Sequence, residues 1–410
     1  MEEWKEYKLG EVLCDKGYIR GPFGSSLKRG DLLCEGIPVY EQQHAIYNKR
    51  DFRFYISEDK YNEMKRFTVY PNDIIISCSG TVGEVSLIKK EDPKGIISQA
   101  LLLLRSNVNI ILPEFLLYFF RTSKGHNSIT SRSSGSVQVN IARREVIEGI
   151  PLLLPDIESQ QKIVSVLKSL DDKIEVNRRI NENLEAQAQA LFKSWFVDFD
   201  PFKEGEFIES ELGQIPKGWR VGNLGEITTQ LSNKVGQEQM KVMSPVTSGK
   251  LMLSEEYFSK QVFSDSIAKY KIVEIGNFAY NPARVNIGSL GRNDYNYKGC
   301  VSPVYVVFSC IDGFSDYFDL FRKTERFQND VKSRAIGGVR QSLNYSDFCL
   351  IKTVIAPQNV LNSFNTLYNP IFSLQKHIEN ENTTLVELRD TLLPRLMSGE
   401  LKVNDIDINI

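Results

Sequence analysis

The stretch DIESQQKIVSVLKSLDDKIEVNRRINENLEAQAQALFKSWF, residues 156–196, decides the fold. Its apolar residues recur at steps of mostly three and four, which predicts one amphipathic helix with a near-heptad period. Neither Gly nor Pro interrupts the stretch, and Asp156 is a candidate N-cap. A helix of about 40 residues spans about 60 Å, so we expect it to pack along a second long helix. The apolar positions are Ile163, Leu167, Leu170, Ile174, Ile180, Leu184, Ala188, Leu191 and Trp195.

The expected partner helix covers residues 359–397. Seven of its eight stripe positions fall on apolar residues of the first helix at an offset of 204. Pro370 is predicted to kink this helix or to mark its true start. Asn177 and Asn382 fall on the two stripes, and two interpretations stay open: an exposed polar position, or a buried Asn that fixes the register. The stripe of the second helix is Leu367, Ile371, Leu374, Ile378, Leu385, Leu388, Leu392 and Leu396.

The segments outside the helices also repeat. EWKEYKLGEVL (3–13) is matched by GWRVGNLGEIT (218–228), and GIISQALLLLR (95–105) by GCVSPVYVVFS (299–309). Within the first copy, short strand-like runs at 37–43, 72–80, 82–88 and 95–105 precede a helical stripe at 112–123. The chain is therefore predicted to be a tandem duplication, each copy a mixed α/β domain followed by a long helix.

The predicted fold class is α+β, with two similar mixed α/β domains separated by two long antiparallel helices that pack like a coiled coil. The expected segments are 1–155 (first domain), 156–200 (first long helix), 201–356 (linker and second domain) and 357–410 (second long helix and tail). Such a duplication predicts internal pseudo-twofold symmetry. Dimeric DNA readers use the same arrangement, because two half-sites at a fixed spacing need two readers on a fixed support. Diverged copies would read an asymmetric, bipartite sequence.

Composition narrows the class of protein. The chain has 410 residues and a net charge of −2, which neither supports nor excludes nucleic-acid binding. The six Cys form no CxxC pair and the three His are far apart, so no metal site is expected. The N-terminus is charged, and the most apolar run (110–120) contains Pro113 and Glu114. We therefore expect a cytoplasmic protein with no membrane segment.

Several motifs resemble one family. LDDKIEVNRRINENLEAQAQALFKSWFVDFDP (170–201) resembles the central conserved region of the specificity subunit of type I restriction-modification enzymes. LRDTLLPRLMSGEL (388–401) resembles the end of that family's C-terminal conserved region. GNFAYNPARVNIGSLG (276–291) and GSVQVNI (135–141) resemble motifs of its target recognition domains. One departure is QNVLNS at the start of the second helix, where the first has ESQQKI.

The resemblance implies a non-catalytic subunit that binds double-stranded DNA and that carries two target recognition domains. It also implies two modification (methyltransferase) subunits clasped around the helices and, in the full complex, restriction subunits that act as an ATP-dependent translocase and nuclease. S-adenosylmethionine, ATP and magnesium would be used by those partners, and no cofactor is expected on this chain.

Two enzymatic interpretations carry less weight. Pro155-Asp156 and Asp171-Asp172-Lys173 fit a nuclease pattern, but about four helical turns separate them, too far to share one metal ion. The string Asn281-Pro282-Ala283-Arg284 lacks the second Pro and the aromatic residue of an amino-methyltransferase motif. No Walker A string is present. A scaffold that reads no sequence remains the main alternative, ahead of a stand-alone methyltransferase or nuclease.

Candidate DNA contacts are Arg, Lys, Gln, Asn, Ser and Thr in Gly-rich or polar loops, because these side chains bind base edges and phosphates. They are Arg20, Ser25, Lys28, Arg29, Gln42, Gln43, Ser79, Thr81, Arg132, Ser136, Gln138, Arg143, Arg284, Asn286, Arg292, Arg334, Arg340 and Gln341. Candidate contacts with partner subunits lie on the helices: Arg178, Arg179, Trp195, Phe196, Arg389, Leu393 and Arg395. Trp195 and Phe196 continue the helical stripe, which favours core or subunit-interface packing over base stacking.

Overall fold

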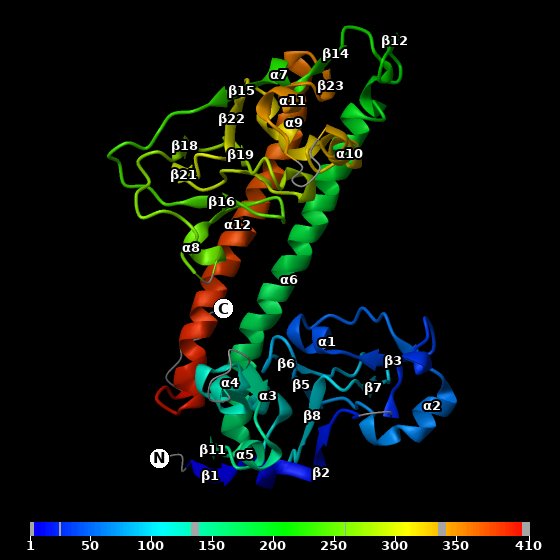
Figure 1. Ribbon diagram of the computed structural model, residues 1–410, viewed down its shortest axis with the longest axis vertical. Helices are drawn as coiled ribbons and strands as arrows, with labels where there is room; N and C mark the ends of the chain where they lie inside the picture. Colours follow the sequence, from blue (N-terminus) through cyan, green and yellow to red (C-terminus); the bar gives the residue numbers. More distant parts are fainter. Residues whose placement is uncertain (1–3, 24–25, 133–138, 259, 335–341, 404–410) are drawn as a thin grey trace. The chain divides into compact units, whose positions relative to one another are not determined.

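A computed structural model describes residues 4–23, 26–132, 139–258, 260–334 and 342–403. The chain forms two compact units, residues 1–177 with 380–410 (unit 1) and residues 178–379 (unit 2). Each unit contains a mixed α/β domain and part of both long helices (Figure 1). The predicted fold class is confirmed at the level of these parts.

Unit 1 is built on a four-stranded antiparallel sheet with the order β2-β8-β5-β6. A smaller sheet, β4-β3-β7, contains a parallel pair, β3 with β7. Its elements are β1 Lys5–Lys8, η1 Leu9–Val12, β2 Leu13–Arg20, η3 Arg29–Asp31, β3 Ile37–Tyr40, α1 Gln42–Ile46, β4 Tyr55–Ile56, α2 Glu58–Glu63, η4 Lys65–Phe67, β5 Ile74–Ser77, β6 Val85–Leu87, β7 Ile96–Ile97, β8 Leu101–Ser106, α3 Pro113–Arg121, α4 Ser123–Ile129, β9 Thr130–Arg132, β10 Val139–Ile141, α5 Arg144–Glu148 and β11 Pro151–Leu154.

Unit 2 repeats this sheet as β15-β22-β19-β20. Its elements are η5 Asp200–Phe202, β12 Phe207–Ser210, β13 Gly213–Pro216, β14 Arg220–Asn223, α7 Leu224–Ile227, β15 Thr228–Leu231, β16 Met243–Pro245, β17 Leu251–Leu253, α8 Ser254–Tyr257, β18 Lys271–Val273, β19 Phe278–Tyr280, η6 Val285–Ile287, β20 Leu290–Arg292, β21 Gly299–Val301, β22 Val306–Cys310, α9 Phe314–Phe321, α10 Glu325–Arg334, α11 Tyr345–Cys349 and β23 Lys352–Ile355.

The pairing registers show that the two units are copies of one design. If the four strands of each sheet are numbered in the order of the chain, both sheets have the spatial order 1-4-2-3. Ile74 lies opposite Leu104 in unit 1, and Phe278 lies opposite Phe308 in unit 2. In each unit the strand just before the four-stranded sheet also pairs with the strand that precedes a long helix, β1 with β11 and β14 with β23. The duplication predicted from the sequence is therefore present in the fold.

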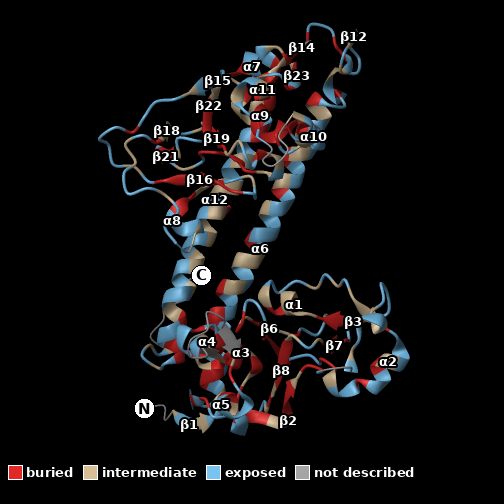
Figure 2. Ribbon diagram, in the orientation of Figure 1, coloured by how far each residue is buried: buried red, intermediate tan, exposed pale blue. Residues whose placement is uncertain are grey.

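Two predicted strands are wrong in detail. The run 37–43 is a strand only to Tyr40, and the short helix α1 begins at Gln42. The run 95–105 is two strands, β7 and β8, which belong to different sheets. A turn closes between them, where Leu101 N–H donates to Ser98 O at 3.1 Å. Apolar residues on both sides of Ser98 and Gln99 hid this turn, because both strands are buried (Figure 2).

The two long helices are α6, Ile157–Phe196, and α12, Gln358–Met397. Asp156 caps α6 as predicted, since its Oδ1 accepts a hydrogen bond from Ser159 N–H at 2.8 Å. Pro370 lies inside α12 and does not mark its start. The helices run antiparallel in each unit. In unit 1, Asp171 contacts Arg389 and Asn177 contacts Asn382. The contacts therefore advance along α6 while they go back along α12.

The predicted stripe of α12 is partly wrong. Leu367, Leu374 and Leu388 are 49%, 45% and 41% exposed. Ile378 and Leu396 of the predicted stripe are buried, and the buried face also contains Phe364, Tyr368, Leu393 and Met397. Apart from Leu396, these residues match buried Ile163, Leu167, Asn177, Phe192 and Phe196 of α6 at the offset of the two helix starts, 201. The sequence stripe of α12 was chosen from its Leu and Ile residues, and these align with α6 at an offset of 204. The stripe missed Phe364 and Tyr368, because large aromatic residues occupy part of the true buried face.

The open question about Asn177 is decided in favour of burial. Asn177 is 2% exposed, and its Nδ2 donates to Glu381 Oε2 at 2.6 Å and to Asn382 Oδ1 at 3.0 Å. Lys173 also pairs with Glu381 at 3.3 Å. The helix pair of unit 1 therefore has a polar layer whose hydrogen bonds favour one register.

Candidate nucleic-acid interface

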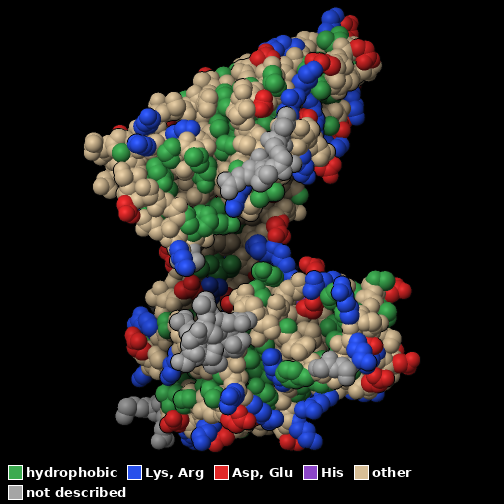
Figure 3. All heavy atoms as spheres, viewed as in Figure 1, with side chains coloured by type: hydrophobic (Ala, Val, Ile, Leu, Met, Phe, Trp, Pro, Cys, Tyr) green, Lys and Arg blue, Asp and Glu red, His purple; other side chains and the backbone are tan. Residues whose placement is uncertain are grey.

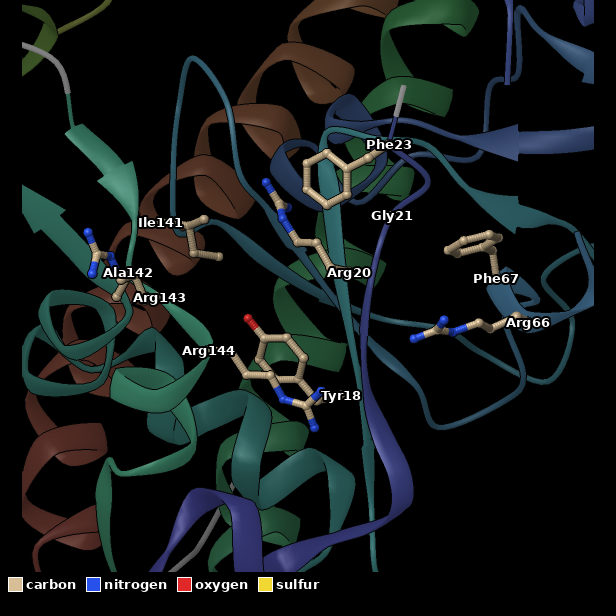
Figure 4. A pocket seen from close by; sticks show the side chains of 10 residues that line it. All are labelled: Tyr18, Arg20, Gly21, Phe23, Arg66, Phe67, Ile141, Ala142, Arg143 and Arg144. Atoms are coloured by element: carbon tan, nitrogen blue, oxygen red, sulfur yellow. The ribbon is translucent and has the colours of Figure 1, made fainter. Parts of the chain in front are cut away.

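A pocket of about 440 Å³ in unit 1 gathers four arginines. Tyr18, Arg20, Gly21 and Phe23 come from β2 and the chain after it. Arg66 and Phe67 come from η4, and residues 141–144 come from the junction of β10 and α5. Figure 4 shows Arg66 and Arg143 on opposite sides of the view, with Arg20 and Tyr18 between them.

The pocket lining contains no carboxylate. Arg144 does pair with Glu148 nearby, at 2.8 Å, and its guanidinium lies 5.0 Å from the centre of the Tyr18 ring. Arg20 Nη1 is buried and donates no hydrogen bond to any described residue. Its neighbour Cys78 supplies no charge, because burial raises the pKa of that thiol to about 11. The pocket is therefore strongly positive and suited to an anion.

Gly21 fixes the position of one wall. Its N–H donates to Leu101 O at 2.9 Å, and a Cβ on Gly21 would lie 2.0 Å from Ser98 O. Only glycine allows this close approach of two backbone segments. The chain after β2 is thereby held against the start of β8, with Phe23 at the edge of the pocket.

The other predicted residues of domain 1 lie in separate turns. Ser79 and Thr81 are exposed in the β5–β6 turn, where Ser77 Oγ donates to Thr81 O at 2.6 Å. Gln42 lies beside this turn, since its Nε2 is 3.7 Å from where a Cβ on Gly80 would be. Gln43 donates to Asp51 O at 3.4 Å. Lys28 and Arg29 are exposed at η3.

In unit 2, three predicted residues belong to one region. Arg284 is exposed and Asn286 is partly buried in the β19–β20 loop. The Ala283 N–H donates to Asn281 Oδ1 at 3.0 Å, which shapes the start of this loop. Helix α10, which ends at Arg334, packs against η6 of the same loop. The structure thus brings the loop of Arg284 and Asn286 together with helix α10.

Arg292 was predicted to contact DNA, and the structure places it in the core instead. It is 5% exposed on strand β20. Its Nε and Nη1 donate to Asp294 Oδ1 at 2.6 Å and to Asp316 Oδ1 at 2.7 Å. The guanidinium also lies 4.5 Å from the centre of the Phe372 ring. The Gly-rich motif around Arg292 looked like a surface loop, but its last residues form a covered strand.

Two of the predicted partner-subunit contacts are also buried within the chain. Phe196 packs with Tyr317, Trp219 and Phe364 in the core of unit 2, and Leu393 belongs to the core of unit 1. Trp195 is partly buried beside the same core as Phe196. On the helix surfaces, Arg178 pairs with Glu182, Arg389 with Asp171 and Asp390, and Arg395 with Glu400. Arg179 is exposed on α6.

Some predicted DNA contacts lie outside the described residues: Ser25, Ser136, Gln138, Arg340 and Gln341. Arg132 ends strand β9, but its side chain is not described. The prediction also missed Arg66 and Phe67 as pocket residues. The available signal was the run Lys65-Arg66-Phe67, in which basic and aromatic residues are adjacent, as at many nucleic-acid surfaces.

Comparison with known proteins points to one family. Residues 1–186 match the type I restriction modification DNA specificity domain. The chain is therefore similar to type I specificity subunits. It is 29% identical to the MjaIX specificity subunit of Methanocaldococcus jannaschii, over 72% of this chain and 71% of that one. It is 25% identical to the HindI specificity subunit of Haemophilus influenzae, over 98% and 100% of the two chains.

The fold is similar to that of a solved specificity subunit. The S subunit of a type I restriction-modification system from M. genitalium superposes with a TM-score of 0.57 over 96% of both chains, at 13% identity. Within the described ranges, no cluster of His, Cys, Asp and Glu could hold a metal ion. No described helix has both the length and the apolar content needed to cross a bilayer.

Proposed function

We propose that this chain is a specificity subunit that reads an asymmetric, bipartite DNA sequence, one half with each unit, and that it catalyses no reaction itself. The observation that carries the proposal is the arginine pocket of unit 1, together with the duplication of the same sheet in unit 2. DNA phosphates are the anions that such a surface would meet in a specificity subunit.

The two units offer different side chains for reading. Unit 1 presents Arg20, Arg66 and Arg143 at the pocket, with Gln42 near the β5–β6 turn. Unit 2 presents Arg284 and Asn286 on its β19–β20 loop. Arg favours guanine and Asn or Gln favours adenine, so different loops select different half-sites.

The helices are proposed to set the gap between the half-sites and to bind two modification subunits. Each is continuous for 40 residues, which supports a role as a spacer. Leu367 and Leu374 are exposed and lie seven residues apart, on one face of α12 in unit 2. Exposed apolar residues on one face are typical of protein interfaces. They replace Phe196 and Leu393 as contact candidates.

The partners supply the chemistry in this proposal. Modification subunits would bind S-adenosylmethionine and transfer the methyl group. Restriction subunits would use ATP and magnesium in the full complex. This chain would determine where on the DNA they act.

Mapping of methylated adenines at single-molecule resolution tests the proposal. The chain would be co-expressed with its cognate modification subunit, and genomic DNA would be sequenced for N6-methyladenine. We expect one split, asymmetric motif with a fixed gap. Methylation without a consistent motif, or unchanged when this chain is left out, would contradict the proposal and favour a scaffold. The double variant L367E/L374E should keep the motif but lower co-purification of the modification subunit.

A further inference from the structure

Phe23 is an exposed aromatic residue held at a charged site. Its side chain is 58% exposed, whereas Gly21 and Pro22 just before it are buried. The close packing of Gly21 on Ser98 fixes the backbone two residues before the ring. A single exposed aromatic residue on a surface needs no explanation by itself. Phe23 differs because it is part of the wall of the arginine pocket (Figure 4).

One face of the Phe23 ring is covered from inside the chain. The Arg20 guanidinium lies 5.5 Å from the ring centre. This contact orients the ring, because a cation is attracted to the face of an aromatic ring. The remaining exposure of Phe23 leaves ring surface available to a second planar group.

The size of the pocket also points beyond a single phosphate. Its volume of about 440 Å³ is within the range of sites that hold small organic ligands. Phe23, Phe67 and Tyr18 give it aromatic walls, and the guanidinium groups give it anion-binding edges. A flat ring joined to a phosphate matches both features, and a nucleotide is such a group.

We propose that this pocket receives one nucleotide of the bound DNA in an unstacked conformation, with its base on the free face of Phe23 and its phosphate on the arginines. The inference rests on the proposed function, since it assumes that unit 1 binds DNA. Stacking on an aromatic ring offsets part of the free energy that unstacking the base costs. A free nucleotide has the same chemistry, so the experiment must distinguish the two sources.

The test uses the full chain in complex with its cognate modification subunits and a duplex that carries the mapped target. 2-Aminopurine replaces one base at a time across the half-site read by unit 1, because its fluorescence rises on unstacking. The adenine that a modification subunit methylates is itself extruded, so we expect a further rise of severalfold at one other position with the wild-type chain. F23A should lose this further rise and F23W should keep it. Y47A is the matched control, since Tyr47 is an aromatic residue of unit 1 that is 68% exposed and outside the pocket lining.

Affinity gives a second readout. A mismatch opposite the unstacked base lowers the cost of removing it from the helix, so wild type should bind that duplex roughly tenfold more tightly. F23A should show a smaller preference for the mismatched duplex, while Y47A should behave as wild type. Equal effects of F23A and Y47A would contradict a specific role for Phe23.

The outcomes separate the two proposals. If the wild-type complex does not prefer the mapped duplex over a scrambled one, the proposed function fails. Specific binding without this further unstacked position overturns only the present inference. Saturable binding of free deoxyadenosine monophosphate by wild type and not by F23A, again without the further unstacked position, would overturn the DNA assignment and make a free nucleotide the occupant.

Discussion

The same sheet carries its buried charges at different places in the two units. In unit 1, Asp73 precedes β5 and pairs with Arg105 of β8 at 2.7 Å. By register, the corresponding residues of unit 2 are Asn277 and Ser309, which cannot form an ion pair. Unit 2 instead has a charged residue in the next strand, where Arg292 lies opposite Phe278. The same position in unit 1 is Leu87, which lies opposite Ile74.

The charge network of unit 2 is also larger. Arg292 contacts Asp294 and Asp316, and Arg322 pairs with Asp319 at 2.6 Å. Arg292 Nη2 lies 3.9 Å from Asp319 Oδ2, beyond a hydrogen bond. Burial alone would lower the pKa of Arg292, but Asp319, Asp294 and Asp316 raise it above its ordinary value. The comparison indicates that apolar patterning and strand pairing define the repeated fold, while ion pairs can move within it.

The largest expected effect is on unit 2. Arg292→Met should destabilise it by about 3–5 kcal/mol, because the buried charge of Asp319 loses one neighbouring cation and partly buried Asp316 loses its hydrogen-bonded partner. Arg105→Met in unit 1 should cost less, since Arg105 is 31% exposed and water can reach its site. Urea unfolding of each variant, followed by hydrogen exchange in β19–β22 and β5–β8 peptides, measures both losses. Equal losses of stability in the two variants would contradict the expectation that the ion pairs of unit 2 contribute more than the pair of unit 1.

A smaller effect, on binding and not on stability, is expected at the pocket. Arg143→Gln removes a charge that no described acceptor in the pocket lining neutralises. It should weaken binding to the mapped duplex by about 1.5 kcal/mol, roughly tenfold, and should reduce the salt slope by about 1. Fluorescence anisotropy at several salt concentrations measures both quantities.

Arg53→Gln is the matched control for the pocket variant. Arg53 belongs to the same unit and is exposed, but it already pairs with Glu41 at 2.7 Å. Its replacement should leave the DNA affinity nearly unchanged. If both variants lower the affinity equally, the effect comes from net charge and not from the pocket.

The smallest expected effect is the change in the stability of each unit at acidic pH. Burial raises the pKa of Asp73, and Arg105 only partly opposes this. Burial would also raise the pKa of Asp319, but Arg322 and Arg292 hold it well below its ordinary value. The contribution of Asp73 to stability therefore increases as pH falls towards its ordinary pKa of about 4, whereas the contribution of Asp319 is constant above about pH 4 and is lost below it.

Between about pH 7 and 4, unit 1 should gain slight protection relative to unit 2, and below about pH 4 unit 2 should lose protection first. Hydrogen exchange of β5–β8 and β19–β22 peptides, corrected for intrinsic rates, measures the protection of unit 1 and unit 2 at each pH. Asp73→Asn should remove the pH dependence of unit 1. Earlier loss of protection in β5–β8 would contradict the assignment.

The sequence by itself determined the repeated order of domain and helix, the two long helices and the approximate positions of several strands of the first copy. These features follow from local periodicity, which a single chain displays directly. It also identified Arg20 and Arg143 as candidates, because basic residues in Gly-rich loops are visible without a fold. The cap at Asp156 could be predicted for the same reason.

Only the tertiary structure decided which charged and polar residues are covered. Arg292 and Arg143 look alike in the sequence, yet α9 supplies two carboxylates that hold Arg292 in the core, while Arg143 faces a pocket without acids. Asn177 is buried because α12 brings Glu381 and Asn382 to it. Arg66 lies near Arg20 because η4, which packs against β7, lines the same pocket as the end of β2. Burial and electrostatic environment arise from residues far apart in the chain, and local sequence patterns do not contain them.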